Sequence, residues 1–245
     1  EIYTLSLHDA LPILVDKAVR TRSVQFLIAI ELCLVFFFSS LVGVPGAQAA
    51  SLPAALAGVM IAGAEYSSGA IMSTVVAVGR RSRLFWAQLV SAAVVTALPA
   101  LALMLGLVLT TRPYTDYRGV AFGLAASLET AVRAALVLAL VAAAGALVVM
   151  GTRSVATASM ALALFVGAVQ ILVMLVPAIL TMGAWTVRLP DWVNVVMPNA
   201  VIARLQGVAA IPASSWLEEP VTTVLLAAAW CLPLFLVNQD RKSVV

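Results

Sequence analysis

The side chains that could carry out chemistry are few in this 245-residue chain and lie far apart in its sequence. His8 is the only histidine, and the carboxylates inside apolar segments occur singly instead of in pairs. Histidine-ligated zinc and Ser/His or Cys/His catalysis need residue sets that this pattern does not offer. Gly58 and Gly63 have the spacing of a phosphate-binding loop, but they are not followed by the Lys and Ser or Thr that such a loop requires. We therefore expect no enzyme active site, no cofactor site and no ATP site on this chain.

One polar stretch could instead receive mechanical work from another protein. It runs from Glu65 to Arg83 and reads EYSSGAIMSTVVAVGRRSR, with a carboxylate at its start and three arginines at its end. Residues 70–78 are apolar enough to pack against a partner but too short to cross a bilayer. Ser67 or Ser68 could cap a short helix, and Gly69 would allow a bend before it. We interpret the stretch as a cytoplasmic coupling helix; alternatively, its arginines reflect membrane topology alone.

Two further charged features lie in or beside apolar segments. Glu31 falls inside the first apolar run, and a carboxylate within a membrane is a functional candidate by default. The alternative is a neutral carboxyl group, or one that faces a neighbouring helix. Glu129 and Arg133 are four residues apart in the order that favours an ion pair on a helix. We interpret this pair as an interfacial anchor of a helix end.

The composition indicates the solvent in which the chain folds. Hydrophobic residues make up 63% of it and charged residues 10%. Soluble domains carry roughly 25% charged residues and about 45–50% apolar ones. Several apolar runs also reach the roughly 20 residues that a helix needs to cross a bilayer. The chain is therefore predicted to be an all-α, polytopic membrane protein.

Six membrane-spanning helices are predicted, with both termini in the cytoplasm. They cover residues 24–44, 49–64, 84–110, 128–150, 155–182 and 221–238. The coupling helix lies between the second and third spans, and residues 151–154 form a tight turn between the fourth and fifth. In this topology the inner segments hold seven basic and two acidic residues, a net charge of +5, and the outer segments are neutral. That asymmetry follows the positive-inside rule.

The two ends of the chain have an unusual character. Residues 1–13 and 240–245 can be read back into complementary nucleotide strings that resemble a sequencing-library adapter. We therefore expect these ends to be adapter-derived and not native. The native part, residues 14–239, then forms a single six-helix domain in which Lys17 is the only lysine.

Three regions of the native part resemble one family of membrane proteins. They read AEYSSGAIMSTVVAVGRRSR (residues 64–83), GTRSVATASMALALFVG (151–167) and MPNAVIARL (197–205). Together with the topology, these regions resemble type-2 ABC transporter permeases, especially the small actinobacterial ones. The motifs are degenerate, and Ala64 stands where the family frequently has Gly.

The resemblance implies a permease subunit of a bacterial ATP-driven exporter in the cell membrane. A separate ABC ATPase would bind the ATP, and a second permease subunit, identical or different, would complete the complex. Lipid is the remaining expected partner, and nucleic acid is not one. The resemblance carries an ATPase-coupling role over to the matching residues, which are Glu65, Tyr66, Ser67, Ser68, Gly69, Ile71, Arg80 and Arg81. The alternative is a membrane-embedded scaffold or processing factor that transports nothing.

Overall fold

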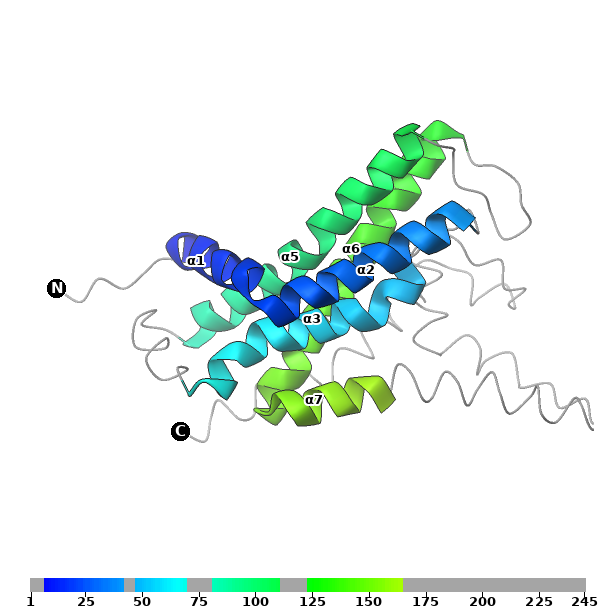
Figure 1. The fold of residues 1–245 in the computed structure, drawn as a ribbon. Helices are drawn as coiled ribbons and strands as arrows, with labels where there is room; N and C mark the ends of the chain where they lie inside the picture. The colour runs from blue at the N-terminus through cyan, green and yellow to red at the C-terminus, as the bar shows by residue number, and fades with distance from the viewer. Residues whose placement is uncertain (1–6, 42–46, 70–80, 111–122, 165–245) are drawn as a thin grey trace, which may run out of the picture.

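The computed structural model describes residues 7–41, 47–69, 81–110 and 123–164, and these form helices and short connections without strands. The arrangement is a bundle of long helices with two shorter helices at one end (Figure 1). In chain order the helices are α1 Leu7–Arg20, α2 Arg22–Leu41, α3 Ala47–Ser67, α5 Arg81–Thr110, α6 Leu124–Thr152 and α7 Val155–Leu162.

Four helices of the described part are long and apolar enough to cross a membrane. They are α2, α3, α5 and α6, and each overlaps one of the first four predicted spans. At 1.5 Å per residue, the 30 residues of α5 extend about 45 Å, more than the roughly 30 Å of hydrocarbon in a bilayer. The all-helical architecture is thus confirmed for the described residues, and four of its helices could span a membrane by their length and composition. The greater part of the fifth predicted span, and all of the sixth, lie outside the described residues.

Several predicted helix boundaries were wrong by two to four residues because helices continue beyond their apolar cores. α3 does not end at residue 64 but extends through Ser67, and α6 begins at Leu124 instead of residue 128. At the end of α3, the backbone N–H of Ser68 still donates to the carbonyl of Ala64 at 3.2 Å. At the start of α6, the N–H of Ser127 donates to the carbonyl of Gly123 at 2.9 Å. Hydropathy locates the membrane core, whereas backbone hydrogen bonds decide where a helix stops.

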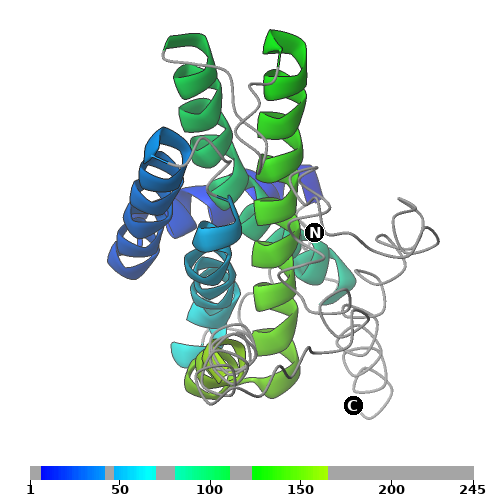
Figure 2. The same ribbon diagram turned by 90° about the vertical axis from the view of Figure 1, so that its right-hand side faces the viewer.

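The four long helices alternate in direction, and the buried residues form two clusters. One cluster contains Val24, Val59 and Met150, and the other contains Val35 and Leu138. The first cluster therefore joins the start of α2 to the ends of α3 and α6. We call this the basic end, since Lys17, Arg20, Arg22, Arg83 and Arg153 all lie near it. Figures 1 and 2 show α7 packed at this end, where it contacts α3 and α6.

α3 and α6 approach so closely that only glycine fits at their contact. A Cβ atom added to Gly58 on α3 would lie 1.9 Å from the carbonyl oxygen of Ala142 on α6. A Cβ atom added to Gly145 on α6 would lie 2.1 Å from the carbonyl oxygen of Ala55 on α3. Both distances are shorter than any van der Waals contact. Small residues at helix interfaces are a common means of packing inside a membrane, where no hydrophobic force favours association.

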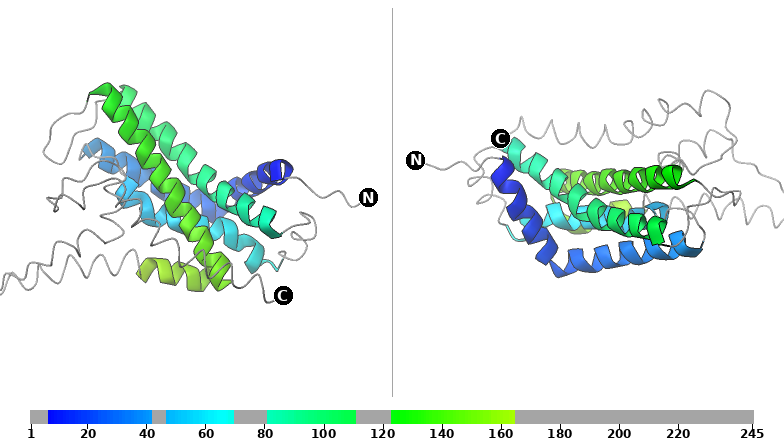
Figure 3. Two further views of the ribbon diagram at one scale, coloured as in Figure 1. Left: turned by 180° about the vertical axis from the view of Figure 1, so that it is seen from behind. Right: turned by 90° about the horizontal axis from the view of Figure 1, so that it is seen from above.

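α1 is an element that we did not predict. Its first seven residues, Leu7–Ile13, belong to the stretch that we expect to be adapter-derived, and that expectation stays a prediction. α1 packs against α5 and meets α2 at a sharp angle (Figure 3). The break lies at Thr21, whose N–H donates to the carbonyl of Ala18 and whose hydroxyl donates to the carbonyl of Lys17. These bonds satisfy carbonyl groups at the end of α1.

The predicted turn between the fourth and fifth spans is confirmed, although it is shorter than residues 151–154. Arg153 takes a left-handed conformation with φ 56°, and its N–H donates to the carbonyl of Val149. Ser154 then caps α7, because its hydroxyl oxygen accepts from the N–H of Thr157 at 3.4 Å.

Candidate functional site at the basic end

The residues predicted to start the coupling element form the last turn of α3. Glu65, Tyr66 and Ser67 are helical, and α3 stops at the following residues. Gly69 has φ 67°, the left-handed conformation in which glycine commonly ends a helix. The hydroxyls of Ser67 and Ser68 donate to the carbonyl of Ala64 at 3.2 and 2.7 Å. In the described part these serines therefore serve the end of α3. The bend predicted between α3 and the coupling helix continues outside the described residues, so it stays a prediction.

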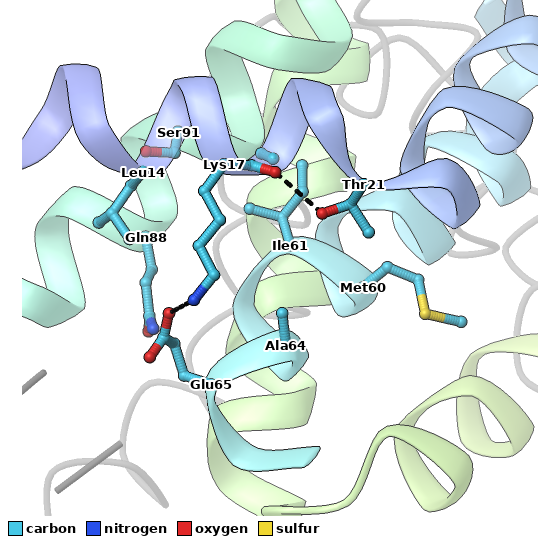
Figure 4. A pocket seen from close by; sticks show the side chains of 10 residues that line it. Leu14, Lys17, Thr21, Met60, Ile61, Ala64, Glu65, Gln88 and Ser91 are labelled. Atoms are coloured by element: carbon cyan, nitrogen blue, oxygen red, sulfur yellow. Dashed lines mark hydrogen bonds and ion pairs between the residues drawn. The ribbon is translucent and has the colours of Figure 1, made fainter. Parts of the chain in front are cut away.

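Glu65 is the central residue of this site. It is only 2% exposed, and its carboxylate forms an ion pair with the ammonium group of Lys17 on α1. Figure 4 shows the Lys17 side chain extending away from α1 toward the carboxylate. The Lys17 side chain itself is 49% exposed, so its charge retains contact with water. Lys17 and Glu65 are 48 positions apart in sequence, and their ion pair links α1 to α3.

Two polar side chains of α5 complete the surroundings of the ion pair. Gln88 and Ser91 are buried, and they line the same small cavity as Lys17, Glu65 and Ala64 (Figure 4). Among the described residues, Nε2 of Gln88 and Oγ of Ser91 have no hydrogen-bond partner. The cavity measures about 10 Å³, which is about the least that a single water molecule requires. The site is therefore too small for an organic substrate, and its chemistry is that of a polar joint between helices.

The remaining predicted coupling residues have different outcomes. Tyr66 is half-buried, and Arg153 at the end of α6 is close enough for its charge to act on the phenol. Arg81 is the first residue of α5, and its backbone alone is described. Ile71 and Arg80, together with the predicted coupling helix, lie outside the described residues.

Glu31, the predicted intramembrane acid, faces the interior of the bundle. The buried residues of α2 are Val24, Glu31, Val35 and Ser39, which occur at helical spacing along one side. Glu31 is 0% exposed, and neither of its carboxyl oxygens has a hydrogen-bond partner among the described residues. Of our two alternatives for this residue, a carboxyl group that faces neighbouring helices agrees with the structure.

The predicted pair of Glu129 and Arg133 is confirmed near the start of α6. The guanidinium group of Arg133 donates to the carboxylate of Glu129, and both side chains are more than half exposed. A second exposed pair that we did not predict joins Arg20 to Asp16 on α1 at 2.9 Å. Exposed pairs of this kind contribute little to stability, typically about 0–1 kcal/mol.

Sequence reasoning missed Lys17, Gln88 and Ser91 as members of the site. Gln88 and Ser91 carried one usable signal, since they are polar residues three apart inside an apolar helix. Lys17 carried another, because it is the only lysine outside the expected adapter ends. Neither signal identifies Glu65 as the common neighbour, which depends on how α1 packs.

Other ligand classes find no support in the described part of the chain. No group of three or more His, Cys, Asp or Glu residues could hold a metal ion there. No family model, curated protein or solved structure matches this chain.

Proposed function

We propose that this chain is a membrane-spanning permease subunit of an ATP-driven exporter of the type-2 ABC class. It would work with a separate ABC ATPase subunit and a second permease subunit in the bacterial cell membrane. The sequence resemblance suggests this class, and the four long apolar helices are compatible with it. The observation that carries the proposal is the joint at the end of α3, where buried Glu65 pairs with Lys17.

The position of this joint suits the transmission of force. Glu65 lies four residues before Gly69, where α3 ends and the chain leaves toward the predicted coupling helix. A force applied to that segment would reach α3 directly, and the ion pair would pass it to α1. Through the glycine contact, the same force would reach α6. The absence of a phosphate-binding motif from the sequence is compatible with a role in which a partner hydrolyses ATP.

The resulting topology is also part of the proposal. The basic residues at the starts of α2 and α5 and directly after α6, which are Arg22, Arg81, Arg83 and Arg153, favour a cytoplasmic location for the basic end. Both termini would then lie in the cytoplasm, and six spans would cross the membrane in all. The coupling residues would face the compartment in which an ATPase is found.

The test is to look for an ABC ATPase gene beside the gene of this chain, to co-express the two proteins and to reconstitute the complex in lipid nanodiscs. We expect the two proteins to co-purify and the chain to stimulate ATP hydrolysis. Glu65→Gln and Gly69→Ala should each reduce the stimulated rate while the protein still inserts and elutes as a single species. Alanine at Gly69 is strained by the left-handed backbone, and not by crowding, because no atom of the described residues lies within 4 Å of its Cβ position.

Each control makes the same chemical change as a test variant, but at a residue away from the end of α3. Glu129→Gln removes a carboxylate at the other end of the bundle, and Gly106→Ala replaces a glycine of α5 that also has open space around it. Both should leave stimulation unchanged. Normal stimulation in Glu65→Gln and Gly69→Ala would overturn the coupling role. Failure of any ATPase to assemble with the chain would favour the alternative of a membrane-embedded scaffold or processing factor.

A further inference from the structure

The carboxyl group of Glu31 has an environment unlike that of the other carboxylates described. Asp16 pairs with Arg20, Glu65 pairs with Lys17, and Glu129 pairs with Arg133. Glu31 is 0% exposed, and both of its oxygens lack a hydrogen-bond partner in the described part. It also lies near the middle of α2, in the apolar span that begins at Arg22.

Charged groups elsewhere do not neutralise it. Besides Glu31, the titratable residues on α2 itself and on the helices that pack against it (α1, α3 and α5) are His8, Asp9, Asp16, Lys17, Arg20, Arg22, Cys33, Glu65, Tyr66, Arg81 and Arg83. Apart from Cys33, all of them lie toward the basic end, and none forms a hydrogen bond or ion pair with Glu31 in the described residues. Cys33 is two residues away on the exposed side of α2.

At 0% exposure an ionised carboxylate in this place would have no contact with solvent, and the described residues offer it no hydrogen-bond donor. Burial of an isolated charge in an apolar medium is so unfavourable that the group takes up a proton and becomes neutral. Full burial also leaves no room for a bulky cation, whereas a proton needs no additional space. A proton is therefore the ligand that fits this buried carboxyl group.

We propose that Glu31 is a proton-binding site within the bundle and that it holds its proton at neutral pH in the arrangement described here. Water or a hydrogen-bond donor at Glu31 favours its ionised form. A rearrangement of α2 that admits either one therefore breaks the O–H bond and passes the proton to water. Proton binding then favours the closed packing of α2 against α3 and α5. The site does not depend on the proposed transport function.

Infrared spectroscopy tests the protonation state directly. Purified protein in lipid nanodiscs at neutral pH should show the carbonyl stretching band of a protonated carboxylic acid. The band should be lost in Glu31→Gln and retained in Glu129→Gln, the matched replacement of an exposed, paired carboxylate. Absence of the band from the unaltered protein, or its persistence in Glu31→Gln, would overturn the proposal.

A second measurement needs no variant and so does not depend on whether Glu31→Gln folds. A hydrophobic carbodiimide reacts with protonated carboxyl groups in membranes. The acid transfers its proton to a reagent nitrogen, its oxygen bonds to the central carbon, and rearrangement gives a stable N-acylurea. Mass spectrometry should find the mass of one intact reagent on the peptide that contains Glu31, and not on those with Glu65 or Glu129. Equal modification of Glu129, or none of Glu31, would contradict the assignment.

Discussion

α3 is held to its neighbours in two different ways along its length. Near its middle, Gly58 and Gly145 let the backbones of α3 and α6 touch. Near its end, Glu65 reaches Lys17 on α1 through an ion pair beside a cavity of about 10 Å³. The first contact depends on shape and excludes any added atom, whereas the second depends on charge and retains room for a water molecule.

This difference indicates where the bundle is rigid and where it can adjust. Backbone contact between a glycine and a carbonyl group of the other helix has no softer arrangement nearby, because sliding or separation of the helices brings atoms into overlap or opens a void. An ion pair with one half-exposed partner can lengthen, admit water and form again. The end of α3 near the predicted coupling segment is thus the adjustable part, and its middle is fixed.

The largest effect is expected from filling the glycine contact. Gly58→Ala and Gly145→Ala would each place a methyl group within 2.1 Å or less of a backbone oxygen of the other helix. We expect each to destabilise the protein by about 1–3 kcal/mol, the usual cost of overpacking a core. Thermal unfolding in detergent, followed by tryptophan fluorescence, measures the change.

Gly106→Ala is the matched control for this experiment. Within the described part of the chain no atom lies within 4 Å of its Cβ position, so alanine should be neutral or stabilising by up to about 1 kcal/mol through its better helix propensity. Equal stability of Gly58→Ala and Gly106→Ala would show that α3 and α6 are not in backbone contact.

An intermediate and asymmetric effect is expected at the ion pair. Lys17→Met leaves the Glu65 carboxylate buried without its partner, whereas Glu65→Gln leaves a lysine that can turn to water. Breaking a fully buried pair costs about 3–5 kcal/mol, and the exposure of Lys17 reduces that cost to about 1–3 kcal/mol. Glu65→Gln should cost less. A double-mutant cycle in detergent measures the coupling, and additive single effects would mean that the pair contributes nothing.

The smallest effect is expected from the exposed pair on α6. Glu129→Gln should change stability by about 0.5 kcal/mol or less, and added salt should reduce even this difference, because both side chains are in contact with solvent. Thermal unfolding at low and high salt measures it. A loss as large as that of Lys17→Met would contradict the view that burial distinguishes the two ion pairs.

Structural features that depend on residues close together in the sequence could be predicted from local sequence patterns. Long apolar runs located four helices, and the spacing of Glu129 and Arg133 predicted their ion pair. Gly69 was expected to supply a backbone conformation that few other residues adopt, and it has a positive φ at the end of α3. Each of these features depends on residues within a turn or two of one another.

Contacts between distant segments could not be predicted in the same way. The pairing of Lys17 with Glu65 requires α1 to cross the end of α3, and no periodicity in either segment specifies that crossing. The roles of Gly58 and Gly145 likewise depend on which helices become neighbours. The helix α1 itself was missed because we set aside the residues that begin it.

The reciprocal glycine contact also limits the kinds of movement that the bundle permits. A slide of one helical turn along α3 would bring Ala54 or Ala62 to the place of Gly58, and a methyl group would then meet the carbonyl of Ala142. The glycine contact therefore prevents α3 from sliding along α6. Rotation of α3 about the contact point is a motion that preserves the contact. When α3 rotates about this contact, a displacement of its Glu65 end moves its opposite end in the contrary direction.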